Sequence, residues 1–483
     1  MAGFSERDER FRTYAQEAPP LRALFTVCAP LALYQALNQI FKILDALMAA
    51  HISASAVSAV SCLSQITLMI TALGTGLAVG GSIKISEAYG QGDDELMSRR
   101  VASVYAMAIA TSAAVALTLI PFAGPFLRLL QTPEELVAAG TGYFRIEILT
   151  LVINFFNTVY IAIERSRGHG GRILVLNLAI IVVKLGLSAL FVYGLQGDLA
   201  LIAVASLAGQ LLLFAYALFA MGRDEGAFRF SLKNISWKRE TTLPILALSY
   251  PAAAEKMFFA AGKVIVNSMS GVYGGLTVGA LGISNNIGGL TTSWHMGLQD
   301  GAAPLISQNR GAGKYRRTLQ LYFWLVAVDV AIGVLGIALV SGSLPWLAEV
   351  FAWSKSNLDQ GFRDQIVAIH RWEMVGYVTL GVNSATISLL LGYGKTKWTM
   401  FLNVIRVFVY RVPVLWYLQH FTSMGPEAVG VTMMVSNVCT GLTAVVVAVP
   451  LVRDIRRLCR GEAGGPPAPG TGGSGEGQNE RHA

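Results

Sequence analysis

The chain consists mainly of apolar stretches long enough to cross a lipid bilayer, separated by short segments that hold most of its charges. A helix needs about 20 apolar residues to span the hydrocarbon core. Apolar residues make up 54% of the chain and charged residues only 14%, compared with roughly 25% charged residues in soluble globular proteins. Inside lipid the backbone must satisfy its own hydrogen bonds, which favours helices over open sheets. The sequence therefore predicts an all-α integral membrane protein and excludes a soluble multi-domain enzyme.

The apolar runs predict about twelve transmembrane helices. Their approximate bounds are 23–48, 55–87, 101–122, 136–163, 173–194, 198–221, 243–270, 276–308, 318–343, 365–391, 398–419 and 428–452. The second and the eighth are long enough to extend beyond the bilayer or to bend.

Lysine and arginine gather in alternate connections between these helices. The loops after even-numbered helices hold sixteen basic residues, whereas those after odd-numbered helices hold three: Arg128, Lys355 and Arg363. Cytoplasmic loops carry the excess of basic residues, so we expect both termini to lie in the cytoplasm. We expect the protein in the plasma (inner) membrane of a prokaryotic cell. The formal net charge of +8 then follows from topology, and no nucleic-acid partner is expected.

The two ends of the chain and its cysteines show no pattern that indicates a further function. Residues 1–22 contain no apolar core of a signal peptide, and residues 461–483 are rich in Gly, Pro and Ser, which predicts disorder. The cysteines have no paired or metal-type spacing, so we expect free thiols and neither a structural metal nor a cofactor. They are Cys28, Cys62, Cys439 and Cys459.

An internal repeat relates the two halves of the chain. The segment from Gly76, GLAVGGSIKISEAYGQGD, aligns with the segment from Gly297, GLQDGAAPLISQNRGAGK, at an offset of 221 residues that also relates Pro30 to Pro251. Six helices per unit is an even number, so both units enter the membrane from the same side and form parallel repeats. We therefore expect a cytoplasmic N-terminal segment (1–22), a first lobe (23–221), a cytoplasmic linker (222–242), a second lobe with a basic end (243–460) and a tail (461–483). Two such lobes enclose a cleft and can rock against each other.

These segments resemble the multidrug and toxic compound extrusion (MATE) transporters. The first two helices of that family are similar to APLALYQALNQIFKILDALMAAH, together with the segment from Gly76, and the start of its second lobe is similar to YPAAAEKMFFAAGKVIVN. The resemblance covers most of residues 23–452. It implies two six-helix lobes that form a V, and export driven by inward flow of H⁺ or Na⁺. The wider superfamily also contains lipid-linked oligosaccharide flippases.

The chain departs from the family pattern at the positions that couple ions. In many prokaryotic relatives the fifth helix carries an Asn and, four residues later, an Asp, which help to build a cation site. The corresponding residues here are Lys184 and Ser188. Another branch uses a Glu on the seventh helix and an Asp on the tenth. This chain has Glu255 one turn nearer Pro251 than in that pattern, and no carboxylate near the middle of the tenth helix. Both H⁺ and Na⁺ therefore remain open as the coupling ion.

Carboxylates at membrane depth are candidate ion-coupling groups, because a charge there costs at least roughly 2.5–3.5 kcal/mol. Asp45, in the first helix, occupies a position that resembles the family's acidic site, with a structural ion pair as the alternative. Glu255 could take a proton, ligate Na⁺ through oxygen, or face the lipid headgroups. Asp300, beside Gly301, is a third candidate.

Basic and polar side chains at the same depth are candidates for the substrate cleft. The repeat relates Lys42 to Lys263, so these two would face the cleft from both halves. Lys184 would pair with Asp45 if the fifth helix packs against the first, as in the resembling family. If several cations face the cleft, an anionic or zwitterionic substrate fits better than a lipophilic cation; snorkelling to headgroups is the alternative. The other basic residues at this depth are Lys84, Lys256, Arg406 and Arg411, and the polar cleft candidates are Gln35, Asn38 and Asn267.

The sequence thus favours an ion-coupled antiporter that exports small organic molecules, with a flippase for an anionic lipid-linked intermediate as the alternative. A membrane enzyme would need a metal cluster, a nucleophile with its base or a phosphate-binding loop, and the sequence contains no spacing typical of these. The expected partners are the bilayer, H⁺ or Na⁺ and the substrate, and the expected state is a monomer.

Overall fold

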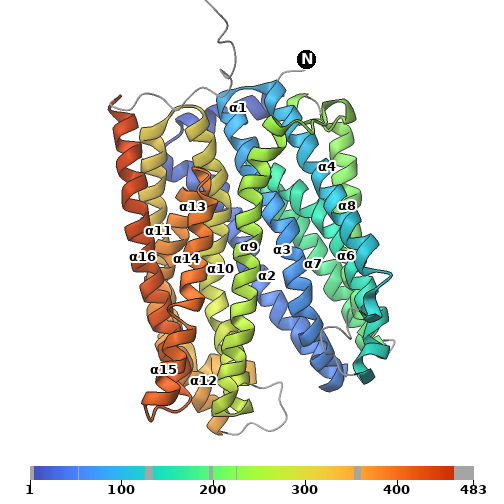
Figure 1. Ribbon diagram of the computed structural model, residues 1–483, viewed down its shortest axis with the longest axis vertical. Helices are drawn as coiled ribbons and strands as arrows, with labels where there is room; N and C mark the ends of the chain where they lie inside the picture. Colours follow the sequence, from blue (N-terminus) through green and yellow to red (C-terminus); the bar gives the residue numbers. More distant parts are fainter. Residues whose placement is uncertain are drawn as a thin grey trace, which may run out of the picture.

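The computed structural model describes residues 5–52, 54–125, 134–194, 199–224, 226–352 and 360–461, apart from the side chains of residues 43–66, 134–140, 199, 200, 202, 351 and 352. Most of its helices run side by side along the long axis of the molecule (Figure 1). The first group is α1 (Glu6–Glu17), α2 (Pro20–Ile52), α3 (Ala54–Gln91), α4 (Asp94–Leu119), α6 (Glu134–Ser166), α7 (Gly170–Ala189) with a π-helical end (Leu190–Gly194), and α8 (Leu199–Arg223). The second group is α9 (Arg239–Ser270), α10 (Gly275–Gly311), α11 (Tyr315–Ala352), α12 (Gln360–Glu373), α13 (Tyr377–Gly392), α14 (Thr396–Phe408), α15 (Val412–Phe421) and α16 (Glu427–Cys459).

The expected architecture of two six-helix lobes in a V is confirmed. The helices α2 to α8 and α9 to α16 diverge toward the end opposite the N-terminus (Figure 1). Eight of the twelve expected spans lie within one described helix, counting the π-helical end of α7; the spans 101–122 and 198–221 overlap α4 and α8, and the other two are interrupted. By length and apolar composition, ten described segments could cross a membrane. The helices α9 and α10 are of similar length but are not among these ten, and both line the cavity described below.

Two expected spans are interrupted rather than continuous. The span 398–419 consists of α14 and α15, with a break at Val409–Arg411. Pro413 stands in the first turn of α15, where it has no N–H to donate and its ring would clash with the carbonyl of residue 409 in a continuous helix. The span 365–391 contains a 3₁₀ turn at Met374–Gly376, between α12 and α13. A Cβ on Gly376 would lie 2.5 Å from that of Asn437, so this turn allows α16 to pack closely.

The 221-residue repeat appears in the structure as reciprocal contacts between the lobes. A Cβ on Gly76 of α3 would lie 2.7 Å from the Cβ of Ala253 on α9, and a Cβ on Gly297 of α10 would overlap the backbone of Ala32 on α2. Ala32 and Ala253 are themselves separated by 221 residues, as are the two glycines. Gly80 and Gly301 repeat the relationship with Ser249 and Cys28. The pairs α3–α9 and α2–α10 are therefore equivalent by the repeat.

The same reciprocity holds at the crossing of α3 and α10. A Cβ on Gly90 would overlap the carbonyl oxygen of Gln308, and a Cβ on Gly311 would overlap the carbonyl oxygen of Glu87. Glu87 and Gln308 are themselves separated by the offset of the repeat. We call these six glycines the glycine seam: Gly76, Gly80, Gly90, Gly297, Gly301 and Gly311. Because small residues let helix backbones approach closely, the seam holds the two lobes together toward the end that carries the N-terminus.

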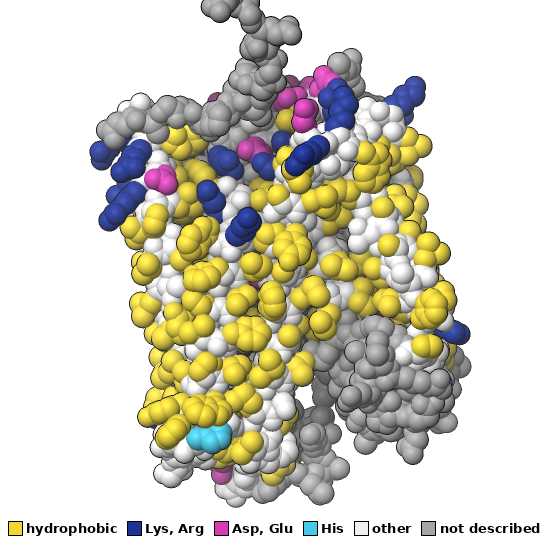
Figure 2. Space-filling view, viewed as in Figure 1, with side chains coloured by type: hydrophobic (Ala, Val, Ile, Leu, Met, Phe, Trp, Pro, Cys, Tyr) yellow, Lys and Arg dark blue, Asp and Glu magenta, His cyan; other side chains and the backbone are white. Residues whose placement is uncertain are grey.

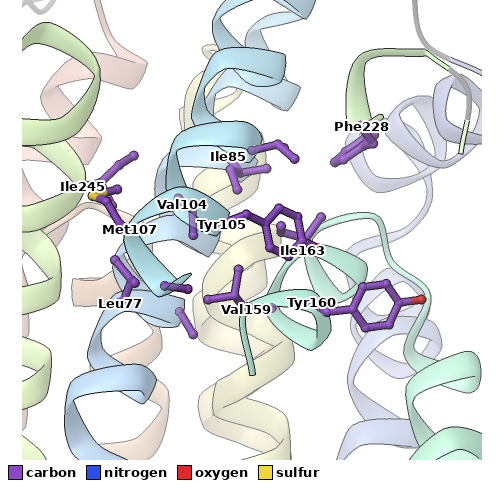
Figure 3. Close-up of a cluster of buried hydrophobic side chains, with 14 of the residues drawn as sticks. Leu77, Ile85, Val104, Tyr105, Met107, Val159, Tyr160, Ile163, Phe228 and Ile245 are labelled. Carbon is purple, nitrogen blue, oxygen red and sulfur yellow. The ribbon is translucent and has the colours of Figure 1, made fainter. Parts of the chain in front are cut away.

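Buried hydrophobic clusters form within the lobes and also between them. In the first lobe Leu77 of α3, Tyr105 of α4 and Val159 of α6 lie in one buried cluster (Figure 3). The ring centroids of Tyr105 and Phe156 are 5.1 Å apart, a favourable separation for an aromatic pair. In the second lobe a separate cluster joins residues of α9 to α12, α15 and α16. A third cluster crosses the lobes, because it joins Leu24 of α2 to Leu305 of α10 and Leu325 of α11.

The helix α1 lies across the end of the molecule near the N-terminus (Figure 1) and contacts both lobes. Ser5 caps it by accepting a hydrogen bond from the backbone N–H of Asp8 (3.3 Å), and acidic residues in its first turn favour a helix there. Arg167 of the first lobe donates from Nε to the buried Asp8 carboxylate over 3.0 Å. On the other side, Asn309 of the second lobe donates to the carbonyl of Ala15 over 3.1 Å.

Charge is distributed as the sequence predicts for a membrane protein. On the face in Figure 2, Lys and Arg gather toward the end that holds the N-terminus, and hydrophobic side chains form a broad band below them. The chain is thus a multi-pass membrane protein.

Candidate substrate cavity

Two connected cavities lie between the lobes. One of about 490 Å³ extends into the second lobe, and one of about 620 Å³ extends into the first. We call them together the central cavity. Volumes in this range hold drug-sized molecules. The two share lining residues from α2, α9 and α10, namely Gln35, Lys42, Glu255, Lys256, Met296 and Gln299.

A polar stripe on α2 contributes to this lining. Gln35, Asn38, Gln39 and Lys42 recur at the three- and four-residue spacing that places side chains on one face of a helix. Asn38 faces the first-lobe part, Gln39 faces the second-lobe part, and the other two face both. In lipid the polar face of a helix turns inward, so the spacing accounts for the position of the stripe.

Asp300 of α10 lies on the first-lobe side of the cavity. Gln35 donates to its Oδ2 over 3.2 Å, and a terminal nitrogen of Arg165 on α6 lies 3.5 Å from the same oxygen. This carboxylate therefore connects both lobes through an ion pair and a hydrogen bond.

Glu255 of α9 lies at the junction of the two parts. Its side chain is buried, Asn403 of α14 donates to its Oε1 over 3.0 Å, and the ammonium of Lys256 lies 3.6 Å from that oxygen. It lines the cavity rather than facing the headgroups.

Three cations gather in the second-lobe part, around a neutral amide. Asn437 of α16 accepts hydrogen bonds at Oδ1 from Arg406 (2.8 Å) and Arg411 (3.4 Å). The Lys263 ammonium and the Arg406 guanidinium lie 5.1 and 5.5 Å from the ring centroid of Phe259, within the range of a cation–π interaction. The break between α14 and α15 brings the two arginines to one site.

A buried His–Asp pair lies beside the same part of the cavity. His295 of α10, a lining residue, has its Nδ1 2.7 Å from Oδ1 of Asp329 on α11, and both side chains are buried. His295 Nε2 and Asp329 Oδ2 have no hydrogen-bond partner within the described part of the chain. A Cβ on Gly381 of α13 would lie 2.7 Å from the carbonyl oxygen of Asp329 and 3.0 Å from the imidazole Cε1, so this glycine makes room for both residues.

The structure brings most of the candidate residues together. Lys263 lines the second-lobe part of the cavity, whereas Asn267, one turn further along α9, has an exposed side chain and is not a lining residue. Lys184 is half-buried on α7, close enough to Lys42 for their charges to interact, and does not line the cavity. Asp45 lies on α2 among the residues whose side chains are not described, so its expected pair with Lys184 lies outside the described contacts.

Sequence reasoning missed the pairing of His295 with Asp329 and the amides that hold the charged groups. A histidine inside an apolar helix was the available signal, but its partner is on another helix. Among the described residues, no group of three His, Cys, Asp or Glu side chains is placed to hold a metal ion.

The family model MatE matches residues 30–190 and 251–417, which is more than half of the chain. The chain belongs to the MATE family. The two matches begin at Pro30 and Pro251, separated by the offset of the internal repeat. The resemblance predicted from the helix motifs is confirmed.

Curated relatives of the chain include proteins of Bacillus and Staphylococcus that are named for multidrug resistance or export. The chain is 21% identical to the probable multidrug resistance protein YoeA of Bacillus subtilis, over 85% of this chain and 89% of that protein. It is 23% identical to the multidrug export protein MepA of Staphylococcus haemolyticus, over 68% of this chain and 73% of that protein. These relatives give no support to the flippase alternative.

Solved MATE structures share the fold. A MATE transporter in complex with MaL6 superimposes with a TM-score of 0.88 at 18% identity, over 94% of this chain and 100% of the other. An outward-facing multidrug resistance MATE transporter gives a TM-score of 0.86 at 18% identity, over 94% and 99% of the two chains.

Proposed function

We propose that this MATE protein is an ion-coupled antiporter that exports small organic molecules across the cytoplasmic membrane by alternating access. The observation that carries the proposal is the central cavity, which both lobes line and which has the volume of a drug-sized ligand. The relatives named for multidrug resistance and export support small organic substrates.

The proposed topology has both termini in the cytoplasm. The lobes comprise residues 23–221 and 243–460, and the linker 222–242 is cytoplasmic. The basic side chains near the N-terminal end support this orientation (Figure 2). In that orientation the glycine seam closes the cytoplasmic side, and export requires the seam to open and close.

The proposed coupling groups are the carboxylates of the cavity and its surroundings. Asp45, Glu255 and Asp300 are retained as candidates for H⁺, and Glu255 with the neighbouring Asn403 as a candidate for Na⁺, because carboxylate and amide oxygens suit hard cations. The His295–Asp329 pair is added because its geometry allows a proton to be shared beside the cavity.

Transport by purified protein in liposomes tests the proposal. Movement of a dye panel is measured under a pH gradient alone, a Na⁺ gradient alone, and neither. Dye movement that depends on one gradient supports an antiporter and identifies its ion. Dye movement that is equal under all three conditions would contradict ion coupling.

A further inference from the structure

The second-lobe part of the central cavity carries an excess of positive charge. Among its described lining residues are two carboxylates, Glu255 and Glu373, and five cations. The cations are Lys42, Lys256, Lys263, Arg406 and Arg411. Charges gathered away from bulk water are costly unless opposite charges or hydrogen bonds compensate them.

The two carboxylates are occupied by other partners. Glu255 interacts with Asn403 and Lys256. Ser284 donates to Oε2 of Glu373 over 2.5 Å, and His370 Nδ1 lies 3.7 Å from the same oxygen. Among the side chains that the structure describes, no carboxylate oxygen lies within 4.0 Å of the charged nitrogens of Lys263, Arg406 or Arg411.

The arginines are held in place by neutral groups. Asn437 accepts hydrogen bonds from both arginines, and Ser436 accepts one from Arg411 Nε over 3.3 Å. The Phe259 ring lies beside Arg406 and Lys263. Arg406 Nε has no hydrogen-bond partner in the described part of the chain. Neutral groups thus orient the guanidiniums. The Glu373 charge acts on Arg406, Arg411 and Lys263 together, so positive charge remains in excess, which favours a carboxylate, sulfonate or phosphate.

We propose that this part of the cavity binds the anionic group of a small organic anion. Arg406 and Lys263 contact the anionic group, Asn437 positions the guanidiniums, and the apolar body of the ligand lies near Phe259 and Leu380. This inference rests on the proposed export function and names its substrate class. A lipophilic cation would add to the positive charge already present. The position of this part of the cavity between the lobes, with lining residues from α2 as well as α9 and α10, favours a small soluble anion over a lipid headgroup.

Binding of two matched dyes to the full-length protein in a neutral detergent tests the inference. Carboxyfluorescein and rhodamine 123 share a xanthene ring but carry opposite net charge, and fluorescence anisotropy reports the binding of each. The wild type is expected to bind carboxyfluorescein more tightly. Arg406→Gln and Lys263→Gln are each expected to weaken that binding about tenfold or more, because a charge-assisted hydrogen bond contributes roughly 1.5–3 kcal/mol.

Control variants distinguish the effect of a charge inside the cavity from the effect of the protein's overall charge. Lys397→Gln removes an exposed positive charge from the same helix as Arg406 and should leave binding unchanged. Arg406→Lys should restore part of the affinity, and Lys263→Glu should shift the preference toward rhodamine 123. The thermal midpoint of each variant shows that it is folded. Lys263→Gln removes no side-chain hydrogen bond to the residues that the structure describes.

The outcomes distinguish this inference from the export function. Unchanged carboxyfluorescein affinity in both Gln variants overturns the anion site. So does displacement of the dye by phosphatidylglycerol but not by phosphatidylcholine, which would identify a lipid site. Gradient-driven export of rhodamine 123 without anion binding overturns the inference and retains the exporter. Arg406-dependent anion binding without gradient-driven transport supports the site and contradicts the exporter.

Discussion

Gly90 of α3 lies directly against the backbone carbonyl of Gln308 on α10, so closely that a Cβ at Gly90 would overlap that oxygen. Gly311 has the same relationship to Glu87. These contacts close the central cavity toward the N-terminal end of the molecule. Arg310 of α10 also lies 3.7 Å from the Glu87 carboxylate of α3, so opening of the seam would separate close backbone contacts and an ion pair.

Gly90→Val is expected to destabilise the closed seam, because overpacking a tight contact typically costs about 1–3 kcal/mol. A cysteine at Ser82, a buried residue lining the first-lobe part of the cavity, should then react faster with an impermeant thiol reagent added from the cytoplasmic side. Gly222→Val is the matched control, since Gly222 also lies next to the last residue of its helix and no atom lies within 4 Å of its added Cβ. Equal labelling of the two variants would contradict the role of the seam.

Arg167→Gln is expected to lower the thermal stability of the protein in detergent strongly. Arg167 is buried, which by itself lowers its pKa, but the carboxylates of Glu164, Asp8 and Asp224 raise that pKa well above its ordinary value. The substitution removes the positive charge that compensates these carboxylates. Breaking a buried ion pair typically costs about 3–5 kcal/mol of folding stability. Arg99→Gln, which removes a half-exposed pair with Glu95, should change stability by less than about 1 kcal/mol.

Asp329→Asn is expected to abolish proton-driven export if the His295–Asp329 pair carries the coupled proton. The substitution keeps the shape of the side chain and removes its titratable charge. Dye binding should persist, and export under a pH gradient should fall to background in the liposome assay. Asp364→Asn, at an exposed position, is the control. Undiminished export by Asp329→Asn, alongside loss in Asp45→Asn or Glu255→Gln, would assign coupling to those carboxylates instead.

Lys184→Met is expected to be less stable in detergent than the double variant Asp45→Asn/Lys184→Met. If the two residues pair, the single substitution leaves one charge without its partner, whereas the double substitution removes both. Melting temperatures of the two single variants and the double variant complete the cycle. Additive losses would show that the residues do not interact, and Lys184 would then have a role at the lipid surface.

Single cysteines at Ser343 and Thr422, in a background without the native cysteines, are expected to react with an impermeant reagent from outside the cell. A cysteine at Ser236 should react only from the cytoplasm. Labelling of Ser236 from outside would reverse the proposed topology.

The sequence by itself determined the membrane helices and their repeat. A bilayer of fixed thickness requires apolar runs of fixed length, so the spans could be placed from composition alone. The match of Gly76 with Gly297 predicted equivalent lobes, because backbone contact at a helix crossing requires small residues at that position whatever surrounds them.

Which polar residues meet depends on how the helices pack. Lys263 and Asn267 are one turn apart on α9, yet only Lys263 lines the cavity. His295 and Asp329 belong to different helices, and Arg406 and Arg411 share Asn437 because the chain breaks between α14 and α15 and α16 packs beside that break. The hydropathy of a segment predicts whether it lies within the membrane. Contacts between side chains also depend on how each helix is rotated and bent against its neighbours, and that is set by packing across the whole molecule.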